Sequence, residues 1–391
     1  MTPLHLLRLL TTLLSVALLG VAIYLIWSGY DHQADYVEAD EDEWRLWFGW
    51  GLLLLSFTGR FLWPMLLAKG GGKHPPVNRA AGHTLTAPDG SQLRVETYGA
   101  PSGPTLVFTH GWGLDSTVWR YARAELGGEF RLVVWDLPGL GKSKGPGDGK
   151  HTLERYAQSL RTVVESAGPG PVVLVGHSIG GMTIQTLCAL HPELLGDRIR
   201  GVVLLNTTHL RPVETTAASG LMKALWPVLL APAAKLMIWL EPLFHLMAWQ
   251  SYLSGQTHLA VRIGGFGRHV TRSQLEHTSL LTTKNRPGVQ AKGDFAMMDW
   301  DVTHKLPDIR VPALVVTGDV DLLTKEEAGE TIARLIPGAR REKMEGCGHM
   351  GFYEYAPRYH EVIADFARPL LAEGAQAQPA GVAPMPSPGH V

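Results

Sequence analysis

Two long apolar runs occupy the first part of the chain. Residues 9–27, LLTTLLSVALLGVAIYLIW, carry no charge, and residues 46–68, LWFGWGLLLLSFTGRFLWPMLLA, carry only Arg60. Each run is long enough to cross the hydrocarbon core of a bilayer as a helix. We therefore predict a membrane anchor over residues 1–70, made of transmembrane helices joined by a loop.

Two other interpretations of these runs stay open. The first run could be a cleaved signal peptide, although it is longer than a usual signal core and no A-x-A pattern follows it. Because Arg60 and Pro64 lie within the second run, its last part could instead sit in the membrane interface, with Arg60 reaching the headgroups. The anchor is therefore predicted to have one or two spans.

The basic residues around the two runs indicate an orientation. Residues 31–43 between the runs include no Lys or Arg, whereas Arg8 precedes the first run and Lys69, Lys73 and Arg79 follow the second. Loops rich in Lys and Arg stay on the cytoplasmic side of a membrane. We therefore expect both ends of the hairpin, and the domain that follows it, in the cytoplasm.

The pattern changes after a Gly- and Pro-rich stretch, which we interpret as a linker over residues 71–84. Short apolar runs then alternate with amphipathic helical stretches; the runs are TLVFTH, RLVVWD, PVVLVGH, GVVLLN and ALVVTGD. Strands that are apolar on both faces are typical of a parallel sheet covered by helices. The pattern predicts an α/β domain over residues 85–207 and 302–370.

The alternation stops between residues 208 and 301, where apolar helical stretches such as GLMKALWPVLLAPAAKLMIWLEPLFHLMAWQ follow one another. We predict that these residues form a helical cap inserted into the α/β domain. A third transmembrane span is not expected, because the run is interrupted by three prolines and two charges: Pro227, Pro232, Lys235, Glu241 and Pro242. Residues 371–391 lack a periodic apolar pattern and are predicted to be a disordered tail.

Composition narrows the choice of partners. The 391 residues carry a formal net charge of -1, and 18% of them are charged, so no basic excess indicates binding to nucleic acid. Cys188 and Cys347 are the two cysteines, and their spacing matches neither a zinc site nor a redox motif. We therefore predict no metal site and no nucleic-acid partner.

A turn between a predicted strand and a predicted helix carries the strongest chemical signal. The segment PVVLVGHSIGG places Gly176, His177, Ser178, Ile179 and Gly180 after a buried strand and before the helical stretch GMTIQTLCALHP. This is the G-x-S-x-G nucleophile elbow in the strand–turn–helix context that it requires. The glycines are needed because side chains at their positions would collide in so sharp a turn. Ser178 is therefore the candidate nucleophile.

A serine hydroxyl is a weak nucleophile and needs a histidine base held by a carboxylate. His349, in EKMEGCGHMGFYE, follows a Gly-rich turn late in the chain and is the candidate base. The carboxylate candidates are Asp321 and Asp319 in the loop after ALVVTG, with Asp299 and Asp301 as further alternatives. The resulting order of serine, aspartate and histidine is the one found with this elbow.

The tetrahedral intermediate of ester cleavage needs two N–H donors for its oxyanion. The loop VFTHGWG follows a predicted strand, and we expect the backbone N–H groups of Trp112 and Ile179 to form this oxyanion hole. His110 and Gly111 are expected to shape the loop. His177, beside the nucleophile, is expected to pack against the elbow and not to act as the base.

Taken in order, HGWG, DLPGLGKS, GHSIGG, GDVD and GCGHM resemble the motifs of the α/β-hydrolase superfamily, over most of the chain between residues 85 and 367. The resemblance implies an α/β-hydrolase fold, with a mostly parallel sheet flanked by helices and an inserted helical cap. Its G-x-x-D pattern favours Asp321 over Asp319. Within the superfamily, the apolar cap and the hairpin resemble those of membrane-anchored lipases and esterases.

These features lead to one main hypothesis and two alternatives. The main hypothesis is a membrane-anchored serine hydrolase, without metal or organic cofactor, that cleaves the carboxylic ester of an apolar, acylglycerol-like substrate beside membrane lipid. An acyltransferase or perhydrolase would use the same triad with another acyl acceptor. A noncatalytic membrane-tethered binding module would retain the fold, but the presence of all three triad candidates argues against it. Nothing in the sequence indicates an oligomeric state.

Overall fold

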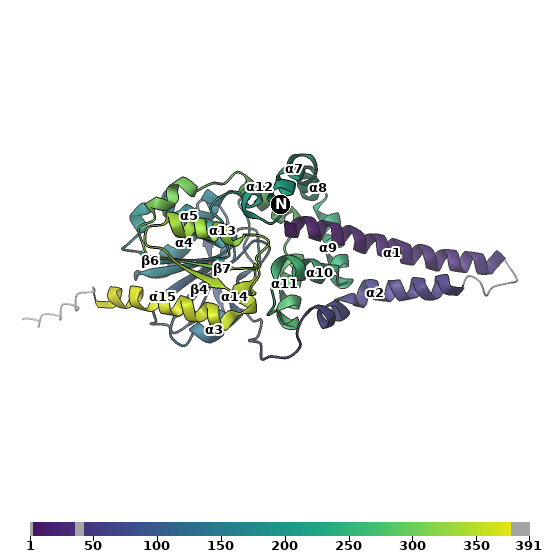
Figure 1. Cartoon of the computed structure of the whole chain (residues 1–391), viewed down its shortest axis with the longest axis horizontal. Coiled ribbons are helices and arrows are strands. Elements are labelled where there is room, and N and C mark those ends of the chain that lie inside the picture. The colour runs from purple at the N-terminus through teal and green to yellow at the C-terminus, as the bar shows by residue number, and fades with distance from the viewer. Residues whose placement is uncertain (1–2, 36–42, 377–391) are drawn as a thin grey trace, which may run out of the picture.

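The computed structural model describes residues 3–35 and 43–376, and its centre is one eight-stranded sheet (Figure 1). The strand order is β1-β2-β4-β3-β5-β6-β7-β8. β2 pairs antiparallel with both β1 and β4, and every other neighbouring pair is parallel. This confirms the prediction of a mostly parallel sheet. The strands are β1 (Gly82–Thr86), β2 (Gln92–Gly99), β3 (Thr105–Thr109), β4 (Arg131–Trp135), β5 (Val172–His177), β6 (Ile199–Leu205), β7 (Ala313–Gly318) and β8 (Arg340–Met344).

Helices cover both faces of the sheet, and the alternation of side chains along each strand supplies a core on each side. On β5, Val172 and Leu174 belong to the core under α4, α5 and α13, whereas Val173 and Val175 belong to the core under α3 and α15. A strand buried on both faces therefore has to be apolar throughout. The helices of this domain are η2 (Ser116–Trp119), α3 (Arg120–Leu126), α4 (Leu153–Ser166), α5 (Ile179–Leu190), η3 (Pro192–Leu194), η5 (Thr303–Asp308), α13 (Glu326–Leu335), α14 (Gly351–Glu354) and α15 (Ala356–Gln376).

A group of helices is inserted between β6 and β7 and lies between the sheet and the N-terminal hairpin (Figure 1). We call this group the cap. Its members are α6 (Pro212–Thr215), α7 (Ser219–Leu225), η4 (Trp226–Leu230), α8 (Ala231–Trp239), α9 (Glu241–Leu253), α10 (Gln256–Gly265), α11 (Arg272–Lys284) and α12 (Pro287–Met298).

The cap corrects one prediction made from its prolines. The chain is helical without a break from Ser219 to Trp239, so Pro227 and Pro232 do not interrupt the run. The reason is that η4 is a π-helical turn, whose shifted hydrogen bonds accommodate a residue that lacks an N–H. This segment, with its apolar composition, is long enough to cross a membrane.

The hairpin consists of α1 (Pro3–Asp35) and α2 (Glu43–Leu67), which pack against each other and extend away from the sheet (Figure 1). Three helices of the described residues are long and apolar enough to span a bilayer: Leu4–Asp31, Glu43–Leu67 and Ser219–Trp239. The described part of α1 begins at Pro3, before the predicted span over residues 9–27. The added turns lie among the cap helices, where α1 contacts α9 and α10.

Small residues join the hairpin to the cap. A Cβ atom on Gly59 of α2 would overlap the carbonyl oxygen of Ser254, and one on Gly255 would overlap the ring of Trp63. On α1, the hydroxyl of Ser15 forms a buried hydrogen bond of 2.8 Å with the hydroxyl of Ser254. Such close backbone approach indicates that the hairpin and the cap pack as one unit.

Two boundaries differ from those predicted. β1 begins at Gly82, inside the stretch interpreted as a linker over residues 71–84, because its residues pair with β2 across the turn at Gly90. α15 continues to Gln376, beyond the predicted start of the tail at residue 371, because Leu371 is buried in the core under α15. The rest of the predicted tail, residues 377–391, lies outside the described residues, as does the loop at residues 36–42.

Candidate active site

Ser178 stands at the turn between β5 and α5, in a strained backbone conformation. Its φ is 54° and its ψ is -122°, values that few residues other than glycine adopt. The two glycines of the elbow are required by their surroundings: a Cβ on Gly176 would lie 2.5 Å from the carbonyl oxygen of Gly180, and one on Gly180 would overlap the carbonyl of Thr109. The turn thus presents the Ser178 side chain above the end of the sheet.

His349 and Asp321 lie together, as the order of the motifs predicts. Nδ1 of His349 is 2.9 Å from Oδ2 of Asp321, and both side chains are buried. Burial alone would raise the pKa of Asp321, but the charge of His349 and its hydrogen bond outweigh this effect. With the N–H groups of Leu323 and Thr324, they hold the pKa of Asp321 below its ordinary value of 3.8. The carboxylate is therefore ionised and orients the imidazole.

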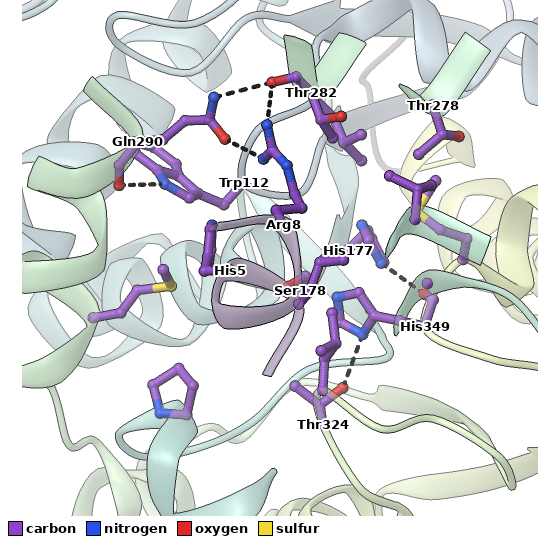
Figure 2. Close-up of a pocket in the computed structure, with 18 of the residues that line it drawn as sticks. His5, Arg8, Trp112, His177, Ser178, Thr278, Thr282, Gln290, Thr324 and His349 are labelled. Atoms are coloured by element: carbon purple, nitrogen blue, oxygen red, sulfur yellow. Dashed lines mark hydrogen bonds between the residues drawn. The ribbon is translucent and has the colours of Figure 1, made fainter. Parts of the chain in front are cut away.

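Ser178 and His349 line the same cavity, whose volume is about 70 Å³ (Figure 2). No hydrogen bond joins their side chains in the described residues, a contact that often tightens only when substrate is bound. Because Asp321 occupies Nδ1 of His349, Nε2 remains for proton exchange with Ser178. The cavity wall is largely apolar and includes Leu114, Met182, Val261, Met297, Leu323 and Met350.

The loop after β3 is held in place by His110. Nε2 of His110 accepts a hydrogen bond from the N–H of Leu137 at 3.0 Å, and Nδ1 donates to the carbonyl of Gly111 at 2.8 Å. The backbone N–H groups of Trp112 and Ile179, which the sequence indicates as oxyanion donors, have no acceptor among the described residues. They are therefore available to a ligand.

His177 supports the loop that carries His349. Its Nε2 lies 2.9 Å from the carbonyl oxygen of His349, and its ring packs against Phe352 with centroids 4.4 Å apart. Burial, together with the nearby His349, holds the pKa of His177 well below 6.5, so its imidazole is neutral and can donate this hydrogen bond. A Cβ on Gly111 would lie 2.5 Å from the His177 ring, which explains the glycine there.

The other carboxylate candidates have different partners. Asp319 accepts a hydrogen bond of 2.7 Å from the N–H of Gly346 and so shapes the loop before His349. Asp301 accepts from the N–H of Thr303 at 2.9 Å. No group of three or more His, Cys, Asp or Glu side chains in residues 3–35 and 43–376 is arranged to hold a metal ion.

Sequence reasoning missed two supports of the Asp321 carboxylate. Asn206, after β6, donates to Asp321 Oδ2 at 3.1 Å and to the carbonyl of Gly348 at 3.2 Å. The hydroxyl of Thr324 donates to Asp321 Oδ2 at 2.8 Å and lies 3.3 Å from His349 Nδ1. The sequence did contain a signal for Asn206, because it is the polar residue that ends the apolar run GVVLLN. Side chains at the carboxyl ends of parallel strands meet at one edge of the sheet.

The N-terminal helix also reaches this site, which no motif indicated. Leu4, His5 and Arg8 of α1 line the cavity that contains Ser178 and His349. Figure 2 shows His5 and Arg8 among them. Although Arg8 flanks the predicted membrane span, its guanidinium is bound inside the protein. Arg79, the last basic residue of that argument, is likewise engaged by Glu96 and Asp136. Lys69 and Lys73 remain as basic residues at the end of the hairpin nearest the sheet, whereas Arg45 lies at the other end of α2.

Comparisons with known proteins agree with this geometry. The family model described as "Alpha/beta hydrolase family" matches residues 106–365. The chain is 28% identical over 266 residues to a pimeloyl-[acyl-carrier protein] methyl ester esterase of Aromatoleum aromaticum, covering 68% of this chain and 98% of the relative. Among solved structures, a thermophilic esterase from Thermogutta terrifontis has a TM-score of 0.55 at 25% identity, covering 75% of this chain and 100% of that one. The enol-lactonase from Burkholderia xenovorans LB400 shares the fold, with a TM-score of 0.59 at 23% identity, covering 73% of this chain and 99% of that one.

Proposed function

This chain belongs to the alpha/beta hydrolase family, and we propose that it is a membrane-anchored serine hydrolase of carboxylic esters. The observation that carries the proposal is the contact of 2.9 Å between His349 Nδ1 and Asp321 Oδ2, beside a cavity that Ser178 shares with His349. A serine on a strained elbow, a histidine and a buried carboxylate are the parts that acyl transfer through serine requires. The names of the relatives, an esterase and a lactonase among them, support the same reaction class.

In the proposed mechanism, Ser178 Oγ attacks the acyl carbon while Nε2 of His349 takes its proton. The N–H groups of Trp112 and Ile179 bind the oxyanion of the tetrahedral intermediate. The intermediate collapses when the C–O bond to the alcohol breaks and His349 returns the proton to the leaving oxygen. Water, deprotonated by His349, then attacks the acyl-enzyme, and the carboxylic acid leaves as Ser178 recovers its proton. Asp321 stays ionised and stabilises the imidazolium in both halves.

The proposed substrate is an apolar ester, taken up next to a membrane. The walls of the cavity are mainly apolar, which suits an acyl chain. Apolar side chains are also exposed on the hairpin and on the adjoining cap. Those that are more than two-thirds accessible include Trp47, Leu66, Val228, Trp239 and Leu246. A surface of this kind is favourable in lipid and costly in water. Lys69 and Lys73 at the base of the hairpin support a cytoplasmic position for the catalytic domain.

The full-length protein in detergent provides the test of this function. A fluorophosphonate probe is expected to label wild-type protein and to leave the folded Ser178→Ala variant unlabelled. Turnover of a medium-chain 4-nitrophenyl ester is expected to disappear in the same variant. A folded wild-type protein that neither reacts with the probe nor hydrolyses short, medium or long esters would rule out the hydrolase function.

A membrane substrate has its own test. Hydrolysis rates would be compared for water-soluble short-chain esters and for long-chain acylglycerols in mixed micelles. A preference for the soluble short-chain esters would rule out the lipid-like substrate while leaving the triad chemistry intact. Protease added to intact cells should spare the catalytic domain, and its digestion would show that the proposed orientation is wrong.

A further inference from the structure

The first two turns of α1 are part of the catalytic cavity. Leu4 packs against α10, where a Cβ on Gly264 would lie 2.8 Å from the Leu4 side chain. His5 and Arg8 follow at helical spacing and face the cavity that holds Ser178 and His349 (Figure 2). A helix that served only as an anchor would have no need to place ionisable side chains there.

The guanidinium of Arg8 is held by neutral oxygen atoms. Nη1 donates to Oε1 of Gln290 at 2.9 Å, and Nη2 donates to the carbonyl of Thr282 at 2.9 Å (Figure 2). No carboxylate of the described residues forms an ion pair with Arg8. A guanidinium carries five N–H groups in a planar fork, so these two bonds leave donors for a further acceptor.

The wall of the catalytic cavity offers Arg8 no compensating charge. Among the residues that line this cavity, none is Asp or Glu. Asp321 lies behind His349, to which it is bound. Asp294 lines a neighbouring cavity, where its Oδ1 is 3.4 Å from Nδ1 of His5. Asp294 attracts the charge of Arg8 from outside the catalytic cavity, so the half-buried Arg8 gives that cavity a partly balanced positive charge at one end.

Arg8 also stands between two cavities. The neighbouring cavity, of about 50 Å³, shares His5, Arg8 and Gln290 with the catalytic one. Its remaining wall is mostly apolar and includes Leu9 of α1, Met237 of α8 and Phe244 of α9. A substrate bound at Ser178 can thus place a polar group at Arg8 and an apolar portion between α1 and the cap.

We propose that Arg8 is a specificity-determining residue that binds an anionic oxygen group of the substrate, a carboxylate or a phosphate. The substrate class becomes an acyl ester that carries such a group within the catalytic cavity. This inference rests on the proposed hydrolase function and adds that the N-terminal helix is part of the substrate site. The physical reason is that a desolvated guanidinium gains most from a charged, planar or tetrahedral oxyanion that replaces its lost hydration.

Matched ester pairs in detergent test the proposal on the full-length protein. The carboxylate pair is mono-4-nitrophenyl adipate against 4-nitrophenyl hexanoate, which have acyl chains of equal length. The phosphate pair is dioctanoyl phosphatidic acid against dioctanoylglycerol. Wild-type protein is expected to prefer the anionic member of one pair by about 10- to 100-fold in kcat/KM, the size expected for hydrogen bonds to a charged group. The pair that shows the preference identifies the anion.

Variants of Arg8 separate recognition from a purely structural role. In Arg8→Gln, kcat/KM is expected to fall at least about tenfold more for the anionic ester than for its neutral partner, so that the preference approaches unity. Arg8→Lys keeps the charge without the fork and is expected to retain part of the preference. Arg272→Gln serves as the matched control, because Arg272 bonds the carbonyl of Met65 at the exposed base of the hairpin. It should leave the preference unchanged.

Two outcomes would overturn the proposal. One is a wild-type protein that shows no preference in either pair, a result that decides the question even if Arg8→Gln fails to fold. The other is an equal loss on neutral and anionic esters in Arg8→Gln, which would show that Arg8 only supports the helix. Fluorophosphonate labelling of wild type separates these outcomes from failure of the proposed function, because an active but unselective enzyme is still labelled.

Discussion

Asn206 joins three parts of the candidate site, and its replacement by alanine gives the sharpest test of the geometry. The residue is buried after β6, at a φ of 45°, in the left-handed region that asparagine tolerates better than alanine. Its amide donates to Asp321 and to the carbonyl of Gly348, and its Oδ1 accepts from the hydroxyl of Tyr359 at 3.1 Å. Asn206→Ala removes all three hydrogen bonds at once.

The expected loss of stability follows from these contacts. Three hydrogen bonds of about 0.5–1.5 kcal/mol each, with some strain for alanine at positive φ, amount to about 3 kcal/mol. For a domain of this size, this corresponds to a fall in melting temperature of about 6–12 °C. The loss in kcat/KM should stay near tenfold, because Asp321 keeps the N–H groups of Leu323 and Thr324 and its contact with His349.

The assay combines thermal unfolding in detergent, followed by circular dichroism, with kcat/KM for a 4-nitrophenyl ester. Asn78→Ala, at an exposed position, is the matched control and should change stability by less than about 0.5 kcal/mol. If Asn206→Ala melted at the wild-type temperature and kept full activity, the network around Asp321 would not support the site as described.

Three further predictions address the carboxylate, the hairpin and the cap. Asp321→Asn should lower kcat by about 10⁴-fold, because the imidazole of His349 loses its orienting charge. A kcat near the wild-type value, calculated per active site labelled by the fluorophosphonate probe, would exclude a role of Asp321 in catalysis. Gly59→Leu should destabilise the protein by about 1–3 kcal/mol because its side chain overlaps Ser254, whereas Gly51→Leu, with nothing within 4 Å, should not; equal melting temperatures would contradict the docking of hairpin on cap. Burial lowers the pKa of His277 from 6.5 to about 4, so the unfolded chain binds its proton at higher pH than the folded one. The neutral His277 therefore contributes fully to the free energy of unfolding above pH 6.5, and this contribution, at most about 3 kcal/mol, is lost as the pH falls toward 4. His277→Gln should make the free energy of unfolding less dependent on pH in this range. An unchanged slope between these pH values would refute the prediction.

The sheet and the elbow could be predicted from the sequence because their signals are local. A strand buried on both faces must be apolar along its whole length, as the segment that became β5 is. The glycine at 176 was predictable because a side chain there would clash with Gly180, only four residues away, whereas a side chain at Gly180 would clash with the carbonyl of Thr109 on another strand. Chain order was enough to indicate Asp321 and His349, since loops after parallel strands meet at one edge of the sheet.

Contacts over long sequence distances were decided by the tertiary structure alone. Arg8 meets Thr282 and Gln290 only because the hairpin docks on the cap, an arrangement that depends on close backbone packing at residues such as Gly59 and Gly255. The sequence determined that α1 is apolar and helical, which is a property of neighbouring residues. It could not determine which side chains the start of this helix would meet, because packing of separate elements depends on the shapes of all the surfaces involved.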